Sequence, residues 1–378
     1  MDWLRCALPE PNPQHSIALT KPFLQTQIKE CLYNAQQRPS HSGHLISTWF
    51  RKNKQVGSRD RKIVSHAVYG IIRNEEFLKK AGFQTIAQQV DGWKKLMAGE
   101  QFLAVPKTSP AIDFATALSL PVEIAQEWQQ KLTVTQCDAL AKTINTRAPK
   151  YIRVNQQRTD RKALQMELKA MAIESEICPS VPSALKIISP ANLVGTKPFQ
   201  QGKFELQDLS SQRFVSALEI TTGMTILDLC AGAGGKSLAL ADLGAKVYAH
   251  DIRSNALYQL QKRAKRGGVS IEIGLPTKVD MVIVDAPCSG TGRLRREPTL
   301  RWRYKNTNFI QQCQNVQQEL LQKAEQLLPQ HGILVYSTCS LLDRENQPVL
   351  KGWKTQQTKW IWPQQQQGDG FFWSVMTR

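Results

Sequence analysis

The chain has 378 residues, with 49 lysines and arginines against 31 aspartates and glutamates, and its net charge of +18 indicates a polyanionic partner, nucleic acid first and an acidic membrane surface second. Its eight cysteines include no C-x-x-C pair, which argues against zinc ribbons and disulfide scaffolds. The metal-like histidine pair His41 and His44 lies in a polar stretch, so no bound metal is expected. No stretch approaches the roughly 20 apolar residues of a membrane-spanning helix, and the first residues lack the features of a signal peptide, so we expect a cytoplasmic protein that does not enter a membrane.

Residues 17–98 are predicted to form a series of helices. Apolar side chains recur at three- and four-residue spacing in residues 24–36, 44–53, 59–74 and 84–97. Ser58 is predicted to cap the third of these helices. The pattern weakens between 99 and 121, and further helices follow to about 144. We interpret residues 1–144 as an all-α domain whose basic surface is either a solvated face or a contact surface for RNA.

A small α/β module is predicted after the helical domain. Residues 150–155 and 184–189 have the pattern of strands, and residues 163–173 have that of a helix. The module ends near residues 202–208, and we assign it residues 145–205.

Residues 206–378 alternate strand-like and helical runs. The strand-like runs lie at 225–230, 246–251, 281–286, 332–338 and 370–377, and the helical runs lie at 237–244, 256–268 and 309–328. Such alternation is typical of a doubly wound, mostly parallel sheet with helices on both faces. Ligands bind these sheets at the carboxyl ends of the strands, so the residues that follow the strands are the candidates for a site.

The glycine-rich segment CAGAGGKS, residues 230–237, follows the first of these strands. The phosphate-loop pattern G-x-x-x-x-G-K-[ST] requires glycine at position 230, which is Cys230, and the dinucleotide pattern G-x-G-x-x-G requires it at position 237, which is Ser237. Asp228 closes this strand and Asp251 closes the next, where an acidic side chain can accept hydrogen bonds from ribose hydroxyls. These features favour a nucleoside ligand without phosphates, and we predict S-adenosyl-L-methionine as the cofactor.

Two cysteines follow later strands. Asp285 and Cys288 come at the end of the strand at 281–286, and Cys339 comes after the strand at 332–338. In a doubly wound sheet these strand ends can be neighbours, so the two thiols could meet beside the cofactor. Core packing is the alternative for any single cysteine. Both of these lie where side chains leave the core and line the crevice, which favours a function.

Together these segments resemble the bacterial RNA cytosine-5 methyltransferases of the Sun/Fmu (RsmB) type, which modify small-subunit ribosomal RNA. The resemblance covers nearly the whole chain. It is carried by the motifs CAGAGGKS, HDIRSNAL, DAPCSGTGRLRREP, Trp302, STCSLLDREN and GDGFF, and upstream by GSRDRKIVSHAVYGIIRN, RAPKYIRVN and FELQDLSSQ. It implies a Rossmann-like class I methyltransferase domain at 206–378, an all-α NusB-like domain at 1–144, and a small α/β, RRM-like module at 145–205.

This resemblance implies roles for the residues at the strand ends. Cys339 would be the nucleophile that adds to cytosine C6, Cys288 would act in the release step, and Asp285 would contact the cytosine edge. The implied cofactor-binding residues are Cys230, Ala231, Gly232, Ala233, Gly234, Gly235, Lys236, Asp251 and Asp285. Family members usually carry another aspartate after the third strand, in contact with the adenine. The matching stretch at 269–280 is short and offers only Glu272, inside the predicted strand, and Asp280, so no residue is assigned to the adenine.

A basic segment follows Cys288. It interleaves cations with aromatic rings, which suits single-stranded RNA, because cations contact the backbone and rings stack on unpaired bases. A solvated basic loop is the alternative. The candidate RNA-binding residues are Arg293, Arg295, Arg296, Arg301, Trp302 and Arg303.

The predicted function is methyl transfer from S-adenosyl-L-methionine to C5 of a cytosine in 16S ribosomal RNA, by a monomer whose partner is RNA. The same motifs fit transfer RNA or large-subunit ribosomal RNA as the substrate. An ATPase is disfavoured by the incomplete phosphate loop. A non-catalytic RNA-binding protein of ribosome assembly is a further alternative, because the helical domain and the charge would suffice for it.

Overall fold

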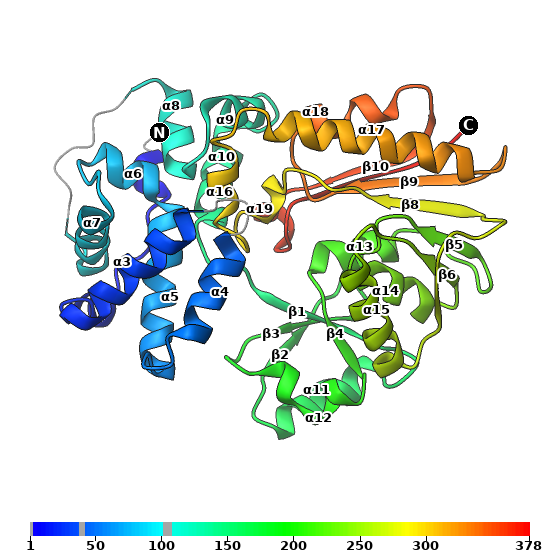
Figure 1. The fold of residues 1–378 in the computed structure, drawn as a ribbon, viewed down its shortest axis with the longest axis horizontal. Helices are drawn as coiled ribbons and strands as arrows, with labels where there is room; N and C mark the ends of the chain where they lie inside the picture. Colours follow the sequence, from blue (N-terminus) through cyan, green and yellow to red (C-terminus); the bar gives the residue numbers. More distant parts are fainter. Residues whose placement is uncertain (1–2, 38–41, 101–107) are drawn as a thin grey trace. The chain divides into compact units, whose positions relative to one another are not determined.

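The computed structural model describes residues 3–37, 42–100 and 108–378 (Figure 1). The chain forms two compact units, Met1–Arg147 with Arg293–Ile310, and Ala148–Gly292 with Gln311–Arg378. The segment Arg293–Ile310, which the sequence placed in the last region, therefore belongs to the first unit. His41 lies outside the described residues.

The first unit is helical, as the sequence predicts. Its helices are α1 (Trp3–Cys6), α2 (Pro13–Ala18), α3 (Pro22–Gln36), α4 (Ser42–Lys52), α5 (Ser58–Arg73), α6 (Glu75–Lys80), α7 (Ile86–Ala98), α8 (Pro110–Leu118), α9 (Val122–Gln129), α10 (Val134–Ile144) and α16 (Leu300–Arg303). Capping boxes begin α7 and α10, where Thr85 and Thr133 exchange hydrogen bonds with the glutamines three residues later. The prediction that Ser58 caps α5 is wrong, because Gly57 is the N-cap and Ser58 is the first helical residue.

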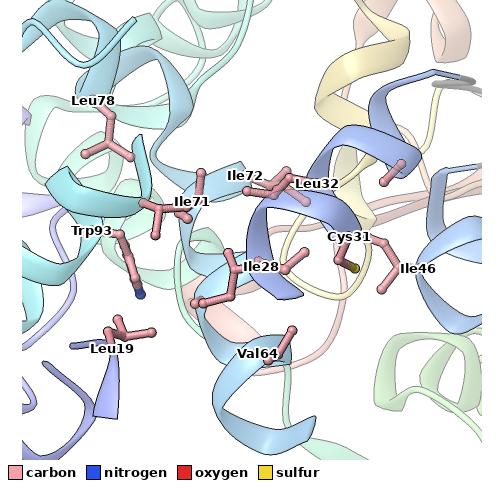
Figure 2. Close-up of a cluster of buried hydrophobic side chains, with 14 of the residues drawn as sticks. Leu19, Ile28, Cys31, Leu32, Ile46, Val64, Ile71, Ile72, Leu78 and Trp93 are labelled. Atoms are coloured by element: carbon pink, nitrogen blue, oxygen red, sulfur yellow. The ribbon is translucent and has the colours of Figure 1, made fainter. Parts of the chain in front are cut away.

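The apolar faces of α3, α4, α5 and α7 meet in one core, part of which Figure 2 shows. Ile28 of α3, Val64 of α5 and Trp93 of α7 are among its buried side chains. At Gly70 of α5 a Cβ atom would lie 2.2 Å from the indole of Trp93, so the close packing of α5 and α7 depends on glycine there. Trp302 of α16 belongs to the same core.

The second unit begins with a small antiparallel sheet. Among the described residues it has four strands in the order β2-β3-β1-β4. Its elements are β1 (Lys150–Val154), α11 (Arg161–Ala170), β2 (Ser175–Ile177), β3 (Ala184–Ile187), the 3-10 turn η2 (Leu193–Gly195), α12 (Lys197–Gln200) and β4 (Phe204–Leu206). The sequence did not predict β2, because this edge strand is short and largely exposed and shows no apolar run.

A larger sheet follows in the second unit. Its described strands have the order β10-β11-β9-β8-β5-β6-β7, in which β5 to β9 are parallel and β10 and β11 are antiparallel. The strands are β5 (Thr225–Asp228), β6 (Lys246–Ala249), β7 (Ile271–Ile273), β8 (Met281–Asp285), β9 (Ile333–Thr338), β10 (Lys354–Ile361) and β11 (Phe371–Thr377). The helices of this region are α13 (Leu209–Ser216), α14 (Gly235–Asp242), α15 (Ser254–Gly267), α17 (Phe309–Leu327), α18 (Asp343–Asn346) and α19 (Pro363–Gln366), with short 3-10 turns η3 (Thr291–Arg293) and η4 (Pro348–Leu350).

Both faces of this sheet are buried. Neighbouring residues of β5 belong to different apolar clusters, Ile226 to one and Leu227 to the other, because successive side chains of a strand point to opposite faces. Helix α14 supplies Leu240 to the first cluster, and α17 supplies Ala324 to the second. The predicted fold class is confirmed. It is a doubly wound and mostly parallel sheet, preceded in the sequence by a helical region and a small α/β module.

The strand order decides which loops can meet. Because β8 lies between β5 and β9, the carboxyl ends of these three strands are side by side.

In the helices that the structure describes, none combines the length and the apolar character needed to cross a membrane.

Candidate active site

Two cysteine-bearing loops meet at the ends of β8 and β9. These strands pair in parallel with Asp285 opposite Ser337, so Cys288 and Cys339 follow neighbouring strand ends. Their Sγ atoms lie 3.3 Å apart, and both side chains are half-buried. The hydrogen bond with Cys339, together with burial, raises the pKa of Cys288 well above the ordinary value of a thiol. Cys288 therefore keeps its proton at neutral pH in this arrangement.

Asp285, the last residue of β8, forms an ion pair with Lys236 of α14. Lys236 Nζ lies 2.6 Å from Asp285 Oδ2, and the Ser337 hydroxyl donates to Oδ1 at 3.1 Å. The ammonium group of Lys236 also lies 5.0 Å from the ring centroid of Phe371. The ion pair joins the first turn of α14 to the strand that leads to Cys288.

The glycine-rich loop turns sharply between β5 and α14. Gly232 and Gly234 have φ angles of +54° and +82°, and a Cβ atom at Gly234 would lie 2.5 Å from Leu260 Cγ. Below the loop, Asp228 Oδ2 accepts a hydrogen bond from Ser237, whereas Oδ1 is buried without a partner among the described residues. Burial raises the pKa of Asp228 to about 6. The loop thus has a buried carboxylate with unused hydrogen-bonding capacity beneath it.

Asp251 lies after β6 and faces the same loop. Its Oδ2 accepts a hydrogen bond from the amide of Gly232 at 2.8 Å, and its Oδ1 accepts one from the amide of Arg253 at 2.9 Å. Burial opposes ionisation, but hydrogen bonds from Arg253 and from these amides outweigh it and lower the pKa of Asp251. The Arg253 side chain, which is two-thirds exposed, bonds both carboxylate oxygens.

Two side chains outside the loop hold its carbonyl oxygens. Arg263 of α15 donates to Ala233 O at 2.6 Å, and Gln207 donates to Gly235 O at 3.0 Å. Arg263 also pairs with Glu205 of β4, and Arg153 of β1 donates to Gln207 Oε1. The small sheet therefore supports the glycine-rich loop, a role that the FELQD motif at 204–208 did not reveal from sequence alone.

Two of the predicted RNA-binding residues are buried in the first unit. Arg301 donates hydrogen bonds to the carbonyl oxygens of Leu118 and Leu294 and to Asn145 Oδ1, and burial lowers its pKa to about 9. Trp302 Nε1 donates to Glu75 Oε2 at 2.5 Å, and only 3% of the Trp302 surface is exposed. These contacts correct the prediction, because neither side chain is available to stack on or pair with RNA.

The other residues predicted for RNA remain candidates. Arg295 and Arg296 are half-buried, Arg293 forms an ion pair with Glu297, and the guanidinium of Arg303 lies 5.9 Å from the ring centroid of Phe309. All four lie in the first unit.

Replacing Trp302 by alanine is expected to destabilise the first unit by about 3–5 kcal/mol, because it removes a buried aromatic ring and leaves Glu75 without one of its donors. Trp302→Phe retains most of the packing and should cost less. Calorimetric unfolding of the full chain measures both variants. Unchanged unfolding of Trp302→Ala would contradict the buried position.

The sequence also missed Glu345, which lies in the STCSLLDREN motif. Its carboxylate accepts hydrogen bonds from Ser289 and Ser340, the residues directly after Cys288 and Cys339. The repeated Cys-Ser pair followed by an acidic residue was the available signal.

Among the described residues, no group of three or more histidine, cysteine or acidic side chains could hold a metal ion.

Two family models match segments of this chain. Residues 215–353 match the family model of the 16S rRNA methyltransferases RsmB/F, and residues 121–193 match the ferredoxin-like domain of RsmF/B-like methyltransferases. The probable ribosomal RNA small subunit methyltransferase B of Bacillus subtilis is 30% identical over 310 residues, which cover 77% of this chain and 67% of that protein. The chain belongs to the RsmB/F family. The resemblance seen in the motifs is thus confirmed.

Other relatives of this RsmB/F chain agree. Ribosomal RNA small subunit methyltransferase B of Photorhabdus laumondii is 31% identical over 280 residues, and the match spans 67% of this chain but only 63% of that protein. The crystal structure of PH0851 is 20% identical and superposes with a TM-score of 0.75 over 94% of this chain and 99% of its own, which shows a shared fold. The family is one of S-adenosylmethionine-dependent methyltransferases, in agreement with the predicted cofactor.

Proposed function

We propose that this RsmB/F protein transfers a methyl group from S-adenosyl-L-methionine to C5 of a cytosine in 16S ribosomal RNA, through a covalent bond between Cys339 and cytosine C6. The observation that carries the proposal is the pair of thiols 3.3 Å apart at the ends of β8 and β9. The names of the family model and of the curated relatives support ribosomal RNA as the substrate.

The loop after β5 fits the methyl donor. Its glycines carry no side chain that would keep a ligand from the backbone, and Asp228, at the end of β5, has an Oδ1 atom without a partner among the described residues. Asp251 has a lowered pKa, is ionised and faces the loop. There it could accept hydrogen bonds from the ribose hydroxyls once the exposed Arg253 side chain turns away. When bound, S-adenosylmethionine supplies an electrophilic methyl group.

The chemistry requires a nucleophile because cytosine C5 is itself weakly nucleophilic. In the proposed reaction the Cys339 thiolate forms a bond to C6, and the electron pair of the C5–C6 double bond moves to C5, which then bonds to the methyl group. Asp285, beside Lys236, would hydrogen-bond the cytosine edge near N3 and favour this addition.

Release requires that the C5 proton leave and that the bond between C6 and sulfur break. The Cys288 thiol lies 3.3 Å from Cys339 Sγ, so it can give its proton to the departing Cys339 thiolate. In the same step the Cys288 sulfur accepts the C5 proton, the electron pair of that C–H bond restores the C5–C6 double bond, and the electron pair of the C6–S bond goes to Cys339. The raised pKa of Cys288 makes its thiolate a strong base.

The net charge of +18 supports RNA as the partner, because phosphate contacts dominate the affinity of proteins for nucleic acids. A target cytosine within a base-paired RNA helix would have to flip out of the stacked bases to reach Cys339. Arg293, Arg295, Arg296 and Arg303 are the predicted contacts to the RNA backbone.

Transfer of labelled methyl groups tests the proposal. Purified protein is incubated with labelled S-adenosylmethionine and unmodified 16S ribosomal RNA or transfer RNA, and the nucleosides are then separated. We expect label in 5-methylcytosine of the ribosomal RNA alone. Label in transfer RNA alone would retain the chemistry and overturn the substrate, and label in a different nucleoside would overturn the chemistry.

A further inference from the structure

Glu345 of α18 is completely buried, yet in the part of the chain that the structure describes it has no ion pair with a cation. Its carboxylate accepts hydrogen bonds from the amide of Ser289 at 2.8 Å, from the hydroxyls of Ser289 and Ser340, and from Gln317 Nε2 at 3.0 Å. Each of these donors is neutral. A buried carboxylate is costly unless its hydrogen bonds are satisfied, so the donors and the acid depend on one another.

The donors come from three separate elements. Ser289 belongs to the loop after β8, Ser340 to the loop after β9, and Gln317 to α17, where the same amide group also donates to Pro287 O. The hydroxyls of Ser289 and Ser340 lie 3.2 Å apart. One carboxylate thus joins the residue after each active-site cysteine.

We infer that Glu345 is a positioning residue that clamps the Cys288 loop to the Cys339 loop and thereby fixes the approach of the two thiols. This inference rests on the proposed function, in which Cys339 attacks and Cys288 assists release. Glu345 bonds to Ser289 and Ser340, the residues directly after the two cysteines, and it acts through them.

The charge of Glu345 adds a second effect. After the hydrogen bond with Cys339 and burial, the coulombic repulsion from Glu345 also raises the pKa of Cys288. An uncompensated negative charge disfavours a second one nearby. The clamp therefore helps to keep Cys288 a thiol while Cys339 acts as the thiolate.

The first test measures the reactivity of Cys288 alone. In a Cys339→Ala background, iodoacetamide alkylation of Cys288 is followed against pH by mass spectrometry, with and without Glu345→Gln. Loss of the charge should move the profile to lower pH and raise the alkylation rate at neutral pH by a factor of about 3–10, since one pKa unit corresponds to a tenfold change in thiolate. Glu319→Gln, which removes an exposed acid from α17, should leave the profile unchanged.

The second test measures the approach of the two sulfurs. Diamide takes up two electrons and two protons from a pair of thiols and becomes a hydrazine, while the thiols become a disulfide. Because a disulfide forms only in a narrow geometry, Glu345→Gln should slow the coupling of Cys288 and Cys339 about tenfold. Tyr336→Phe, which removes the hydrogen bond from Tyr336 to Glu345 O but leaves the carboxylate in place, should couple at the wild-type rate.

Neither test needs RNA or a methyl donor, so each decides on Glu345 even where methyl transfer is not detected. If a folded Glu345→Gln variant has the wild-type pH profile of Cys288 alkylation and the wild-type rate of disulfide coupling, the inference is overturned and Glu345 is only a structural residue. If Glu345→Gln does not fold, Glu345→Asp takes its place. The shorter acid keeps the charge and the pH profile but should slow the coupling, and an unchanged rate would overturn the clamp.

Discussion

Replacing Cys339 by alanine is expected to abolish methyl transfer, with a fall in turnover on the order of 10⁴-fold or more, as when the nucleophile of a covalent mechanism is removed. Cys339 is the thiol that the proposed reaction bonds to C6. Without it the electron pair of the C5–C6 double bond is not released toward C5. Incorporation of labelled methyl into RNA measures the loss.

The variant should retain the fold and the donor site. Cys339 is half-buried at a loop, and the residues that hold the glycine-rich loop come from other elements. Binding of S-adenosylmethionine, followed by calorimetry, should therefore stay at the wild-type level. Cys178→Ala removes a buried thiol of the same unit and should keep full activity. A Cys339→Ala protein that still methylates RNA would remove the covalent mechanism.

Much of the catalytic fold could be predicted because buried parallel strands produce apolar runs. The residues at or just after the strand ends, Asp228, Asp285 and Cys288, could then be placed at one edge of the sheet. The polar edge strand β10, KTQQTKWI, has no such run, because half of its side chains are exposed and only the last is buried, and it was missed.

The supports of the site could not be predicted in the same way. Glu345, Arg263 and Gln207 act through hydrogen bonds to residues far away in the sequence. Ser289 and Glu345, for example, are 56 positions apart. Only the fold brings these groups together. The motifs that contain Glu345 and Gln207 were visible, but the bonds that they make were not.

The segment after Cys288 misled the sequence analysis for a related reason. Alternating arginines and aromatic residues are typical of an RNA-binding loop. They also suit a buried segment in which the polar ends of the side chains form hydrogen bonds within the protein. Trp302 finds its acceptor, Glu75, 227 positions away. The pattern of cations and rings is the same in both cases, and only the presence of Glu75 and Asn145 decides between them.

Replacing Cys288 by alanine is expected to trap a covalent complex between the protein and methylated RNA. In the proposed release step Cys288 gives its proton to the departing Cys339 sulfur as it accepts the C5 proton. Alanine can do neither, so the bond between Cys339 and C6 should persist after methyl transfer. A slower band on a denaturing gel, sensitive to ribonuclease, measures the adduct.

The controls follow from the geometry. The adduct should require the methyl donor, because the step that fails comes after transfer, and it should vanish in the double variant Cys288→Ala with Cys339→Ala. Cys288→Ser keeps a small group with a proton at the same place, but the serine hydroxyl is a far weaker acid than a thiol, so this variant should also accumulate the adduct. If Cys288→Ala instead turns over at the wild-type rate and shows no adduct, the short distance between the sulfurs serves packing, and a different group must take the C5 proton.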